Sequence, residues 1–389
     1  MTSTLVSSRL SPLARRVEPF HVMRLLGRAA ELEAQGRSIV HLEVGEPDFP
    51  TPEPIVEAGR RALADGRTRY TPARGLAALR EDLAGYYAGR YGVPVDPACI
   101  LVTPGASGAL QLVFQAVLEP GDRVLLCDPS YPCYRQVLRL LSVEPVAVPV
   151  GPQTNYQLTV DLAAEAWVPG VRAVVVASPS NPTGSSLDPA VMAGLCRERG
   201  AAFIVDEIYQ GLTYEAPDRT ALALGSEDLY VINSFSKYFG MTGWRLGWLV
   251  GPADAVSVMD RMAQNLFLAA NTPAQYAARA ALAPATRPIL DGRALAFRQR
   301  RDRHRSFCKL CYTSTGRSMR TGSGVMRQDR LITRKRCESE RGTPAGASKH
   351  PEHLPRKALH KIAFSPILLS ESRGHPPVYA VYLRSVRGI

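Results

Sequence analysis

The sequence predicts an α/β protein, with a large domain built on a mostly parallel sheet covered by helices and a smaller domain beside it. Between about residues 45 and 285, short apolar runs bounded by turn residues alternate with stretches whose apolar residues recur every three or four positions. The length of 389 residues is also enough for more than one domain. Strands and helices in alternation are the arrangement that covers a parallel sheet.

The expected strands are short runs rich in Val, Ile, Leu or Phe, as strands buried on both faces are. They are Ile100–Val102, Val124–Cys127, Ala173–Ala177, Phe203–Val205, Tyr230–Ile232 and Leu246–Val250. The expected helices between them include Gly75–Tyr91, Gly108–Leu118 and Pro189–Arg199. Ligands of such sheets bind at the carboxyl ends of the strands. Polar residues that directly follow the apolar runs are therefore the candidates for chemistry.

The chain is expected to divide into three segments. Residues 1–44 form an N-terminal arm and an amphipathic helix, from about Val22 to Gln35, that belongs to the small domain. Residues 45–290 form the large domain. Residues 291–389 stand where the rest of the small domain is expected but are atypical, because beyond about residue 297 neither helical nor strand periodicity persists for more than a turn.

The net charge of +12 comes from the C-terminal segment alone. Residues 301–389 hold 19 Lys and Arg against 6 Asp and Glu, whereas the first 300 residues hold 28 against 29. A basic, disordered segment is expected there, which binds nucleic acid weakly and without specificity, so no specific nucleic-acid partner is predicted. No apolar run is long enough to cross a membrane and no secretory signal opens the sequence, so a cytoplasmic protein without a membrane partner is expected.

The most informative segment reads SFSKYFGMTGWRLG, from Ser234 to Gly247, and lies between two expected strands. Lys237 is flanked by hydroxyl residues at the end of a strand, which places it in a crevice where an amine can condense with an aldehyde cofactor. For an isolated lysine, a surface position is the plain alternative, because Lys is rarely buried.

Polar or small residues also follow four other expected strands, and each of them could have an ordinary structural role or belong to a site. Asp206, in FIVDEIY, is either a helix cap or an acid of the site. Asn181, in SPSNPTG, suits an ordinary turn, and Tyr131, in DPSYPCY, suits a core. Gly105, in VTPGASGAL, opens a helix whose N-terminal N–H groups and dipole favour a phosphate.

Together these segments resemble, position by position and in the same order, the motifs of the class I/II pyridoxal-phosphate-dependent aminotransferases of fold type I, the aspartate aminotransferase-like enzymes. The resemblance covers about residues 15–295. It implies a transaminase that moves an amino group between an L-amino acid and a 2-oxo acid. Lys237 would hold pyridoxal 5′-phosphate as an internal aldimine and then move the proton between the substrate α-carbon and C4′ of the cofactor.

The resemblance also assigns the residues around the cofactor ring. Asp206 would pair with the pyridine nitrogen and keep it protonated, so that the ring takes up the electrons left by the α-proton. Tyr209 would hydrogen-bond the 3′ oxygen, and Tyr131 would stack on the ring face. Asn181 would contact the 3′ oxygen and help to place the substrate carboxylate. Glu207 is left as a solvated or capping residue.

The phosphate and the substrate side are assigned in the same way. Gly105, Ala106 and Ser107 would form the phosphate cup. Ser234 and Arg245 would bind the phosphate from the opposite side, since a guanidinium offers fixed donors to phosphate oxygens.

The resemblance also assigns one residue to the substrate and one to a neighbouring subunit. Gly45, in LEVGEPDF, would lie against the substrate. Tyr70, in RYTP, would reach the phosphate of a neighbouring subunit, which implies a homodimer.

The C-terminal segment departs from the family pattern. In the family, the last ninety or so residues complete the small domain and supply an arginine, in an Arg-x-x-Phe-like stretch, for the substrate α-carboxylate. No such stretch is present, and Arg384 is the nearest candidate by position. Our hypothesis is a shift of reading frame or a fusion in the gene, because charge, His content and periodicity all change abruptly. Sequencing the gene tests it, and an intact frame shared with relatives would refute it.

The sequence supports other functions less well. A lyase or decarboxylase of the same fold would use the same lysine, and the atypical segment raises a catalytically impaired aminotransferase relic. A zinc site from Cys308, Cys311, Cys337 and His350 has irregular spacing, so no metal is predicted. A hydrolase triad lacks a histidine after a core strand.

The first four cysteines are expected to be small buried hydrophobes rather than disulfides. They are Cys99, Cys127, Cys133 and Cys196.

Overall fold

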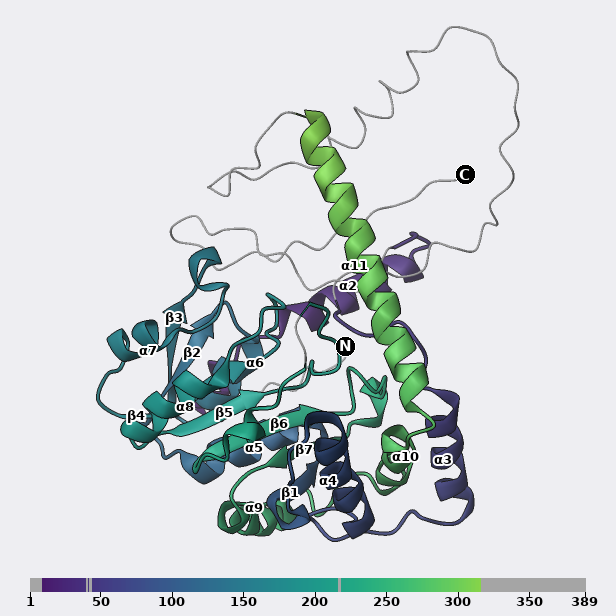
Figure 1. Ribbon diagram of the computed structural model, residues 1–389, viewed down its shortest axis with the longest axis horizontal. Coiled ribbons are helices and arrows are strands. Elements are labelled where there is room, and N and C mark those ends of the chain that lie inside the picture. The colour runs from purple at the N-terminus through teal and green to yellow at the C-terminus, as the bar shows by residue number, and fades with distance from the viewer. Residues whose placement is uncertain (1–8, 40, 42–43, 216–217, 316–389) are drawn as a thin grey trace, which may run out of the picture.

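A computed structural model describes residues 9–39, 41, 44–215 and 218–315, with side chains described as far as residue 303. Its centre is a seven-stranded sheet in the order β1-β7-β6-β5-β4-β2-β3. Six strands run in one direction and β7 runs antiparallel to both of its neighbours. The predicted mostly parallel α/β fold is therefore confirmed, and Figure 1 shows the sheet with helices packed around it.

The strands follow the predicted apolar runs closely. They are β1 (Ile100–Thr103), β2 (Arg123–Asp128), β3 (Glu144–Pro149), β4 (Val171–Ala177), β5 (Ala202–Asp206), β6 (Leu229–Ser234) and β7 (Gly247–Val250). Only β3 was not predicted. It contains Pro145 and Pro149, and it pairs only with β2 at the edge of the sheet, where prolines are tolerated because one side of the strand needs no ladder bonds.

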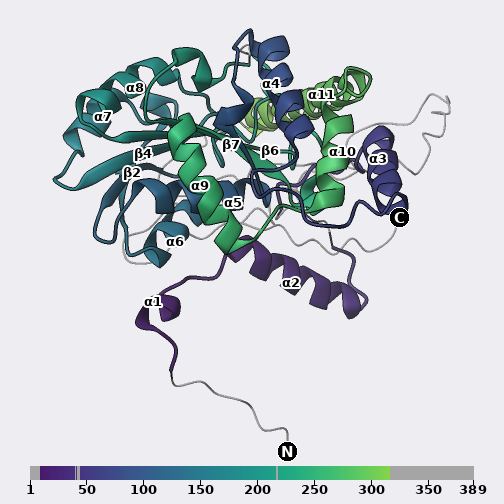
Figure 2. The same cartoon turned by 90° about the horizontal axis from the view of Figure 1, so that it is seen from below.

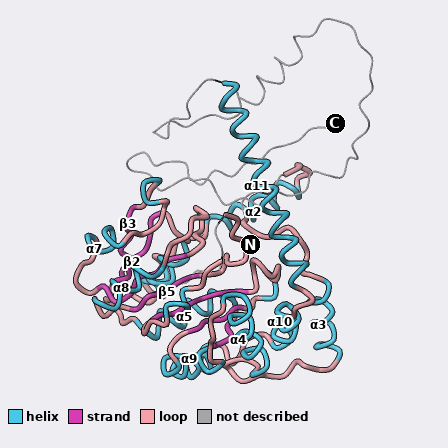
Figure 3. The backbone as a smooth tube through the Cα atoms, in the orientation of Figure 1, coloured by secondary structure: helices cyan, strands magenta, loops and turns pink. Residues whose placement is uncertain are grey.

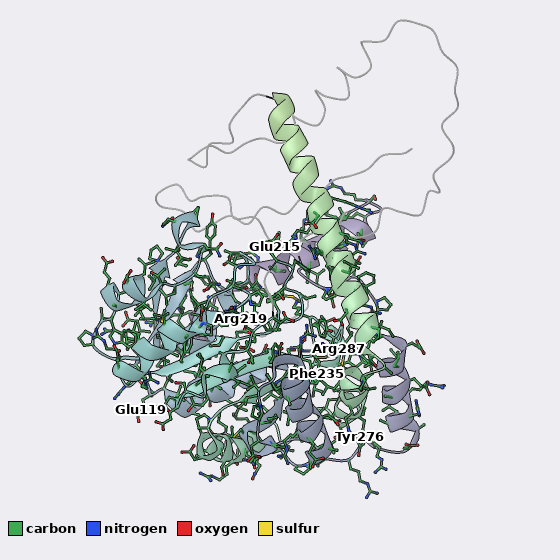
Figure 4. All side chains as sticks on the ribbon, viewed as in Figure 1. Glu119, Glu215, Arg219, Phe235, Tyr276 and Arg287 are labelled. Carbon is green, nitrogen blue, oxygen red and sulfur yellow. The ribbon has the colours of Figure 1, made fainter. Side chains whose placement is uncertain are left out.

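The helices cover both faces of the sheet, because alternate residues of each strand point to opposite sides. They are α1 (Pro12–Arg15), α2 (His21–Ala34), α3 (Glu53–Ala64), α4 (Ala77–Tyr91), α5 (Gly105–Val117), α6 (Pro132–Leu140), α7 (Val160–Glu165), α8 (Pro189–Glu198), α9 (Ala253–Leu266), α10 (Thr272–Leu282) and α11 (Arg287–Thr315). Short 3-10 turns occur at η1 (Pro97–Cys99), η2 (Pro152–Thr154), η3 (Ala221–Leu224) and η4 (Thr242–Trp244). Figure 3 shows the strands gathered in the centre of these helices.

The core divides into three clusters by sheet face. On one face, α5, α6 and α9 pack on residues such as Leu126 and Ile232. On the other face, α7 and α8 cover one half of the sheet at residues such as Val174. The remaining half of that face, around Trp248, packs against α3, α4 and α10. Figure 2 shows α1 and α2 on the outside of this α/β body.

The expected loss of helical structure after residue 297 is wrong for the next eighteen residues. Helix α11 continues to Thr315 and extends beyond the body of the protein in Figure 1. Its sequence has no steady apolar stripe, but its seven Arg residues are good helix formers. Of the four cysteines expected to be buried, Cys127 and Cys196 are buried, Cys99 and Cys133 are half-buried, and all are free thiols.

The start of β7 lies unusually close to the first turn of α5. A Cβ atom at Gly247 would stand 2.7 Å from the carbonyl carbon of Gly105, 2.8 Å from the amide nitrogen of Ala106 and 2.8 Å from the carbonyl oxygen of Asn233. These are backbone atoms that no side-chain rotation can move. Only glycine therefore allows the strand and the helix to meet here.

We expect Gly247→Ala to lower the free energy of unfolding by about 1–3 kcal/mol, because overpacking against backbone forces the strand and helix apart. Urea denaturation measures the change. Gly194→Ala in α8 is the matched control, since its Cβ would meet nothing within 4 Å and Ala favours a helix interior. Equal midpoints for Gly247→Ala and the parent chain would contradict the prediction.

Candidate active site

Lys237 lies just beyond the end of β6, where its amine is held in a confined position. Its Nζ donates a hydrogen bond to the carbonyl oxygen of Gly45 at 2.6 Å and stands 5.8 Å from the centre of the Tyr209 ring. Burial lowers the pKa of Lys237 below its ordinary value; Glu46 opposes this change and Arg245 adds to it. A larger share of neutral, nucleophilic amine is therefore present near neutral pH.

Asp206 is the last residue of β5 and is buried. The hydroxyl of Tyr134 donates to its Oδ2 at 2.6 Å, and the amide of Ile208 donates to its Oδ1 at 3.1 Å. Burial raises the pKa of Asp206, and these two hydrogen bonds oppose the rise. A buried carboxylate is costly without an opposite charge, so this position favours a cationic partner such as a protonated ring nitrogen.

The residues predicted to contact the cofactor ring gather near Asp206. The side-chain amide of Asn181 donates to the hydroxyl of Tyr209 at 3.3 Å. Tyr131 is half-buried, and its ring meets the ring of Tyr134 edge-on at 5.3 Å. The structure thus brings together residues that follow three different strands.

The predicted phosphate cup is the first turn of α5, which begins at Gly105 rather than at Gly108 as the sequence indicated. Gly105 has a φ of 71°, and a Cβ atom there would stand 2.8 Å from Nη2 of Arg245. The exposed guanidinium of Arg245 therefore lies over the N-terminus of this helix, in whose first turn Ser107 is also exposed. Open N–H groups, a helix dipole and a guanidinium together form an anion site.

Two further residues predicted to bind the phosphate, Ser234 and Tyr70, differ in how their side chains are held. Ser234 is buried, and its hydroxyl bonds to the carbonyl oxygen of Leu246 at 3.0 Å and accepts from the amide of Ser236 at 3.0 Å. Its contacts in this structure are therefore internal. Tyr70 is 81% exposed and lies in the loop before α4, so its side chain packs little against its own chain.

Glu207 is buried rather than solvated, and the capping alternative describes it better. It is 1% exposed, and its Oε1 accepts from the amide of Ala221 at 2.6 Å, at the first residue of η3. Burial raises the pKa of Glu207 to about 8, while the bonds from Ala221 and Thr220 act in the opposite direction. The carboxyl group is therefore largely protonated below that pH.

Sequence reasoning missed two contacts of the site. Tyr134, which bonds Asp206, lies three residues after Tyr131, and this helical spacing could have placed both tyrosines on the same side of α6. The hydroxyl of Thr242 donates to the carboxylate of Glu46, which ties the segment around Gly45 to the loop after Lys237. No sequence signal indicates that contact, because the two residues are 196 positions apart.

The residues present fit pyridoxal phosphate. A cradle without a Cβ at Gly105, under a guanidinium, suits the phosphate group. A buried acid suits the ring nitrogen, and an amine of lowered pKa suits the aldehyde. Among the residues with described side chains, no cluster of His, Cys, Asp or Glu could hold a metal ion. Arg384 and the possible zinc ligands have side chains outside the described residues.

The fold and this set of groups define a pyridoxal-phosphate enzyme, and comparison with known proteins names its family. The family model described as "Aminotransferase class I and II" matches residues 37–318. The chain belongs to this family.

Named relatives share most of their length with the chain. It is 40% identical over 280 residues to the valine–pyruvate aminotransferase of Mycobacterium tuberculosis, covering 71% of this chain and 72% of the relative. It is 37% identical to the arginine–pyruvate transaminase of Pseudomonas aeruginosa, covering 71% of each. The structure of aspartate aminotransferase from Thermus thermophilus with maleate matches with a TM-score of 0.74 at 34% identity, covering 79% of this chain and 81% of that one.

The protein is therefore a pyridoxal-phosphate-dependent transaminase, and a lyase or decarboxylase of the same fold is not favoured. Small-molecule amino acid and 2-oxo acid substrates are consistent with this family. Within the described residues, no helix is both long and apolar enough to span a membrane.

Glu207 gives the apo protein a specific pH dependence. Its folded pKa of about 8 lies above the ordinary value of 4.5, so its contribution to stability is complete below pH 4.5 and is lost as the pH rises through 8. We expect the ionisation of Glu207 to lower the free energy of unfolding by roughly 3–5 kcal/mol between pH 5 and pH 9. Glu207→Gln keeps the acceptor for Ala221 but does not titrate. Urea unfolding of this variant should therefore show a smaller fall in the free energy of unfolding between these pH values. An equal fall in both proteins would contradict the assignment.

Proposed function

We propose that Lys237 is the lysine that holds the cofactor and the base that carries the proton taken from the substrate α-carbon. The observation that carries this proposal is the half-buried amine of lowered pKa at the end of β6, next to the ring of Tyr209. Pyridoxal phosphate, when bound, supplies an aldehyde for amines and a protonated ring that takes up an electron pair. The neutral amine of Lys237 can accept a proton at Nζ, which the carbonyl oxygen of Gly45 then helps to hold.

Around the ring, we assign Asp206 to the pyridine nitrogen, where a cation would offset the cost of its buried charge. Tyr209 and Asn181, already hydrogen-bonded to each other, would hold the 3′ oxygen. Tyr131 would cover one ring face. Asn181 would also help to place the substrate carboxylate, and Gly45 would leave room beside Lys237 for the substrate.

At the phosphate end, Gly105, Ala106 and Ser107 would donate from the first turn of α5, and Arg245 would close the opposite side. Ser234 would join them if its hydroxyl exchanges the carbonyl of Leu246 for a phosphate oxygen. Electrostatic attraction from a helix N-terminus and a guanidinium would hold the dianion without any metal.

We further propose a domain organisation and a setting for the reaction. Residues 45–290 form the cofactor-binding domain, and residues 1–44 with residues 291–389 take the place of the small domain. The protein acts in amino acid metabolism, in a biosynthetic process, in the cytoplasm. Pyruvate is the first amino acceptor to test, because two of the named relatives carry it in their names.

We expect the full chain to form a visible absorption band with pyridoxal phosphate and Lys237→Ala to form none, because the band requires an amine bonded to the aldehyde. Adding L-amino acids should convert the band to the amine form, and pyruvate should restore it. We expect conversion to be more impaired than cofactor binding, because the family's carboxylate arginine is absent from the atypical C-terminal segment. The same band in Lys237→Ala would refute the proposed lysine.

A homodimer with Tyr70 acting across the interface predicts complementation. Tyr70→Phe should weaken cofactor binding about tenfold, the loss expected for one hydrogen bond to a charged group. A mixed dimer of Tyr70→Phe and Lys237→Ala chains contains one site with both native residues, so half of its sites should bind with native affinity. Absorbance titration of co-expressed, doubly tagged dimers measures this. Binding no better than in the Tyr70→Phe homodimer would exclude action across the interface.

A further inference from the structure

Residues 45–51, here called the strap, lie against the loop that carries Lys237. At one end, the carbonyl oxygen of Gly45 accepts from Nζ of Lys237 at 2.6 Å. At the other end, the hydroxyl of Thr51 donates to the carbonyl oxygen of Gly240 at 2.8 Å. Both ends of the strap therefore depend on the position of that loop.

The opposite side of the strap is held by α11. Nη1 of Arg300 lies 2.6 Å from Oδ1 of Asp48. The guanidinium of Arg300 also stands 4.8 Å from the centre of the Phe49 ring, and Arg293 stands 5.3 Å from the same ring. The ring of Phe297 packs edge-on against the ring of Phe49, with the two ring centres 5.4 Å apart. One turn after another of α11 thus contacts the middle of the strap.

The Asp48–Arg300 pair is shielded from water, unlike most of the charged side chains described on α11. The side chain of Asp48 is 9% exposed and that of Arg300 is 24% exposed. By contrast, Arg298 and Asp302 on the same helix stand 4.0 Å apart and are each 51% exposed. Removing one partner of a shielded pair leaves the other charge without compensation, whereas an exposed pair contributes little.

We propose that Asp48 and Arg300 are positioning residues that hold the strap over Lys237, so that the docking of α11 sets where the carbonyl of Gly45 meets the lysine amine. The proposal rests on Lys237 as the cofactor lysine. Neither residue touches the reacting atoms; they act through the strap. Loss of the pair would let the strap leave the loop and expose the amine to water.

Hydrogen–deuterium exchange of the full chain tests this directly. We expect Arg300→Met and Asp48→Asn each to speed exchange in peptides covering residues 44–52 by about tenfold, with β4 peptides unchanged. Arg300→Lys, which keeps the charge, should restore much of the protection. Arg298→Met is the matched control and should behave as the parent. If Arg300→Met fails to fold, Asp48→Asn, which keeps the shape of the side chain, carries the test.

A double-mutant cycle separates positioning from general stability. If the pair acts as a unit, Asp48→Asn combined with Arg300→Met should speed strap exchange and cofactor release no more than either change alone. Additive effects, or strap exchange in Arg300→Met equal to that in Arg298→Met, would overturn the proposal. A parent chain that forms no lysine-dependent band would instead refute the role of Lys237, and the exchange results would still report on the strap.

Discussion

The parallel pairing of β4, β5 and β6 is the constraint on which the site depends. Ala177, Asp206 and Ile232 stand side by side in register, so the segments that follow these strands leave the sheet at the same edge. That edge receives the loop of Asn181, the acid Asp206 and the loop of Lys237. Because β7 runs in the opposite direction, the chain enters it from this edge, which brings Arg245 to the N-terminus of α5.

The sequence predicted most of this arrangement, because its signals are local. Buried parallel strands are continuous apolar runs, and the polar residues of the site follow them directly. The edge strand β3 carries two prolines, and three of its six residues are exposed, so it lacked that signal. Contacts between distant residues could not be predicted. Tyr134 meets Asp206 from 72 positions away, and no periodicity in α11 indicated its helix or its docking.

Asp206 and Glu207 show how one strand end can place two acids in different roles. Successive residues of a strand point to opposite faces, so one carboxyl group faces the site and its neighbour faces the covering elements behind it. Asp206 is bonded by a tyrosine hydroxyl, and Glu207 by the backbone of η3. Burial raises both pKa values, but only the first acid lies among the residues suited to a cofactor. Adjacent residues of the same type therefore need not share a function.

The tethering of the strap by α11 also has a consequence for the order of folding. Asp48 and Arg300 are 252 positions apart, and Gly45 and Lys237 are 192 apart. Contacts of such long sequence separation form late, because closing a long loop costs entropy before any contact repays it. During synthesis the ribosome releases the strap long before α11. The sheet can therefore assemble first, and Lys237 acquires its cover only after α11 has emerged.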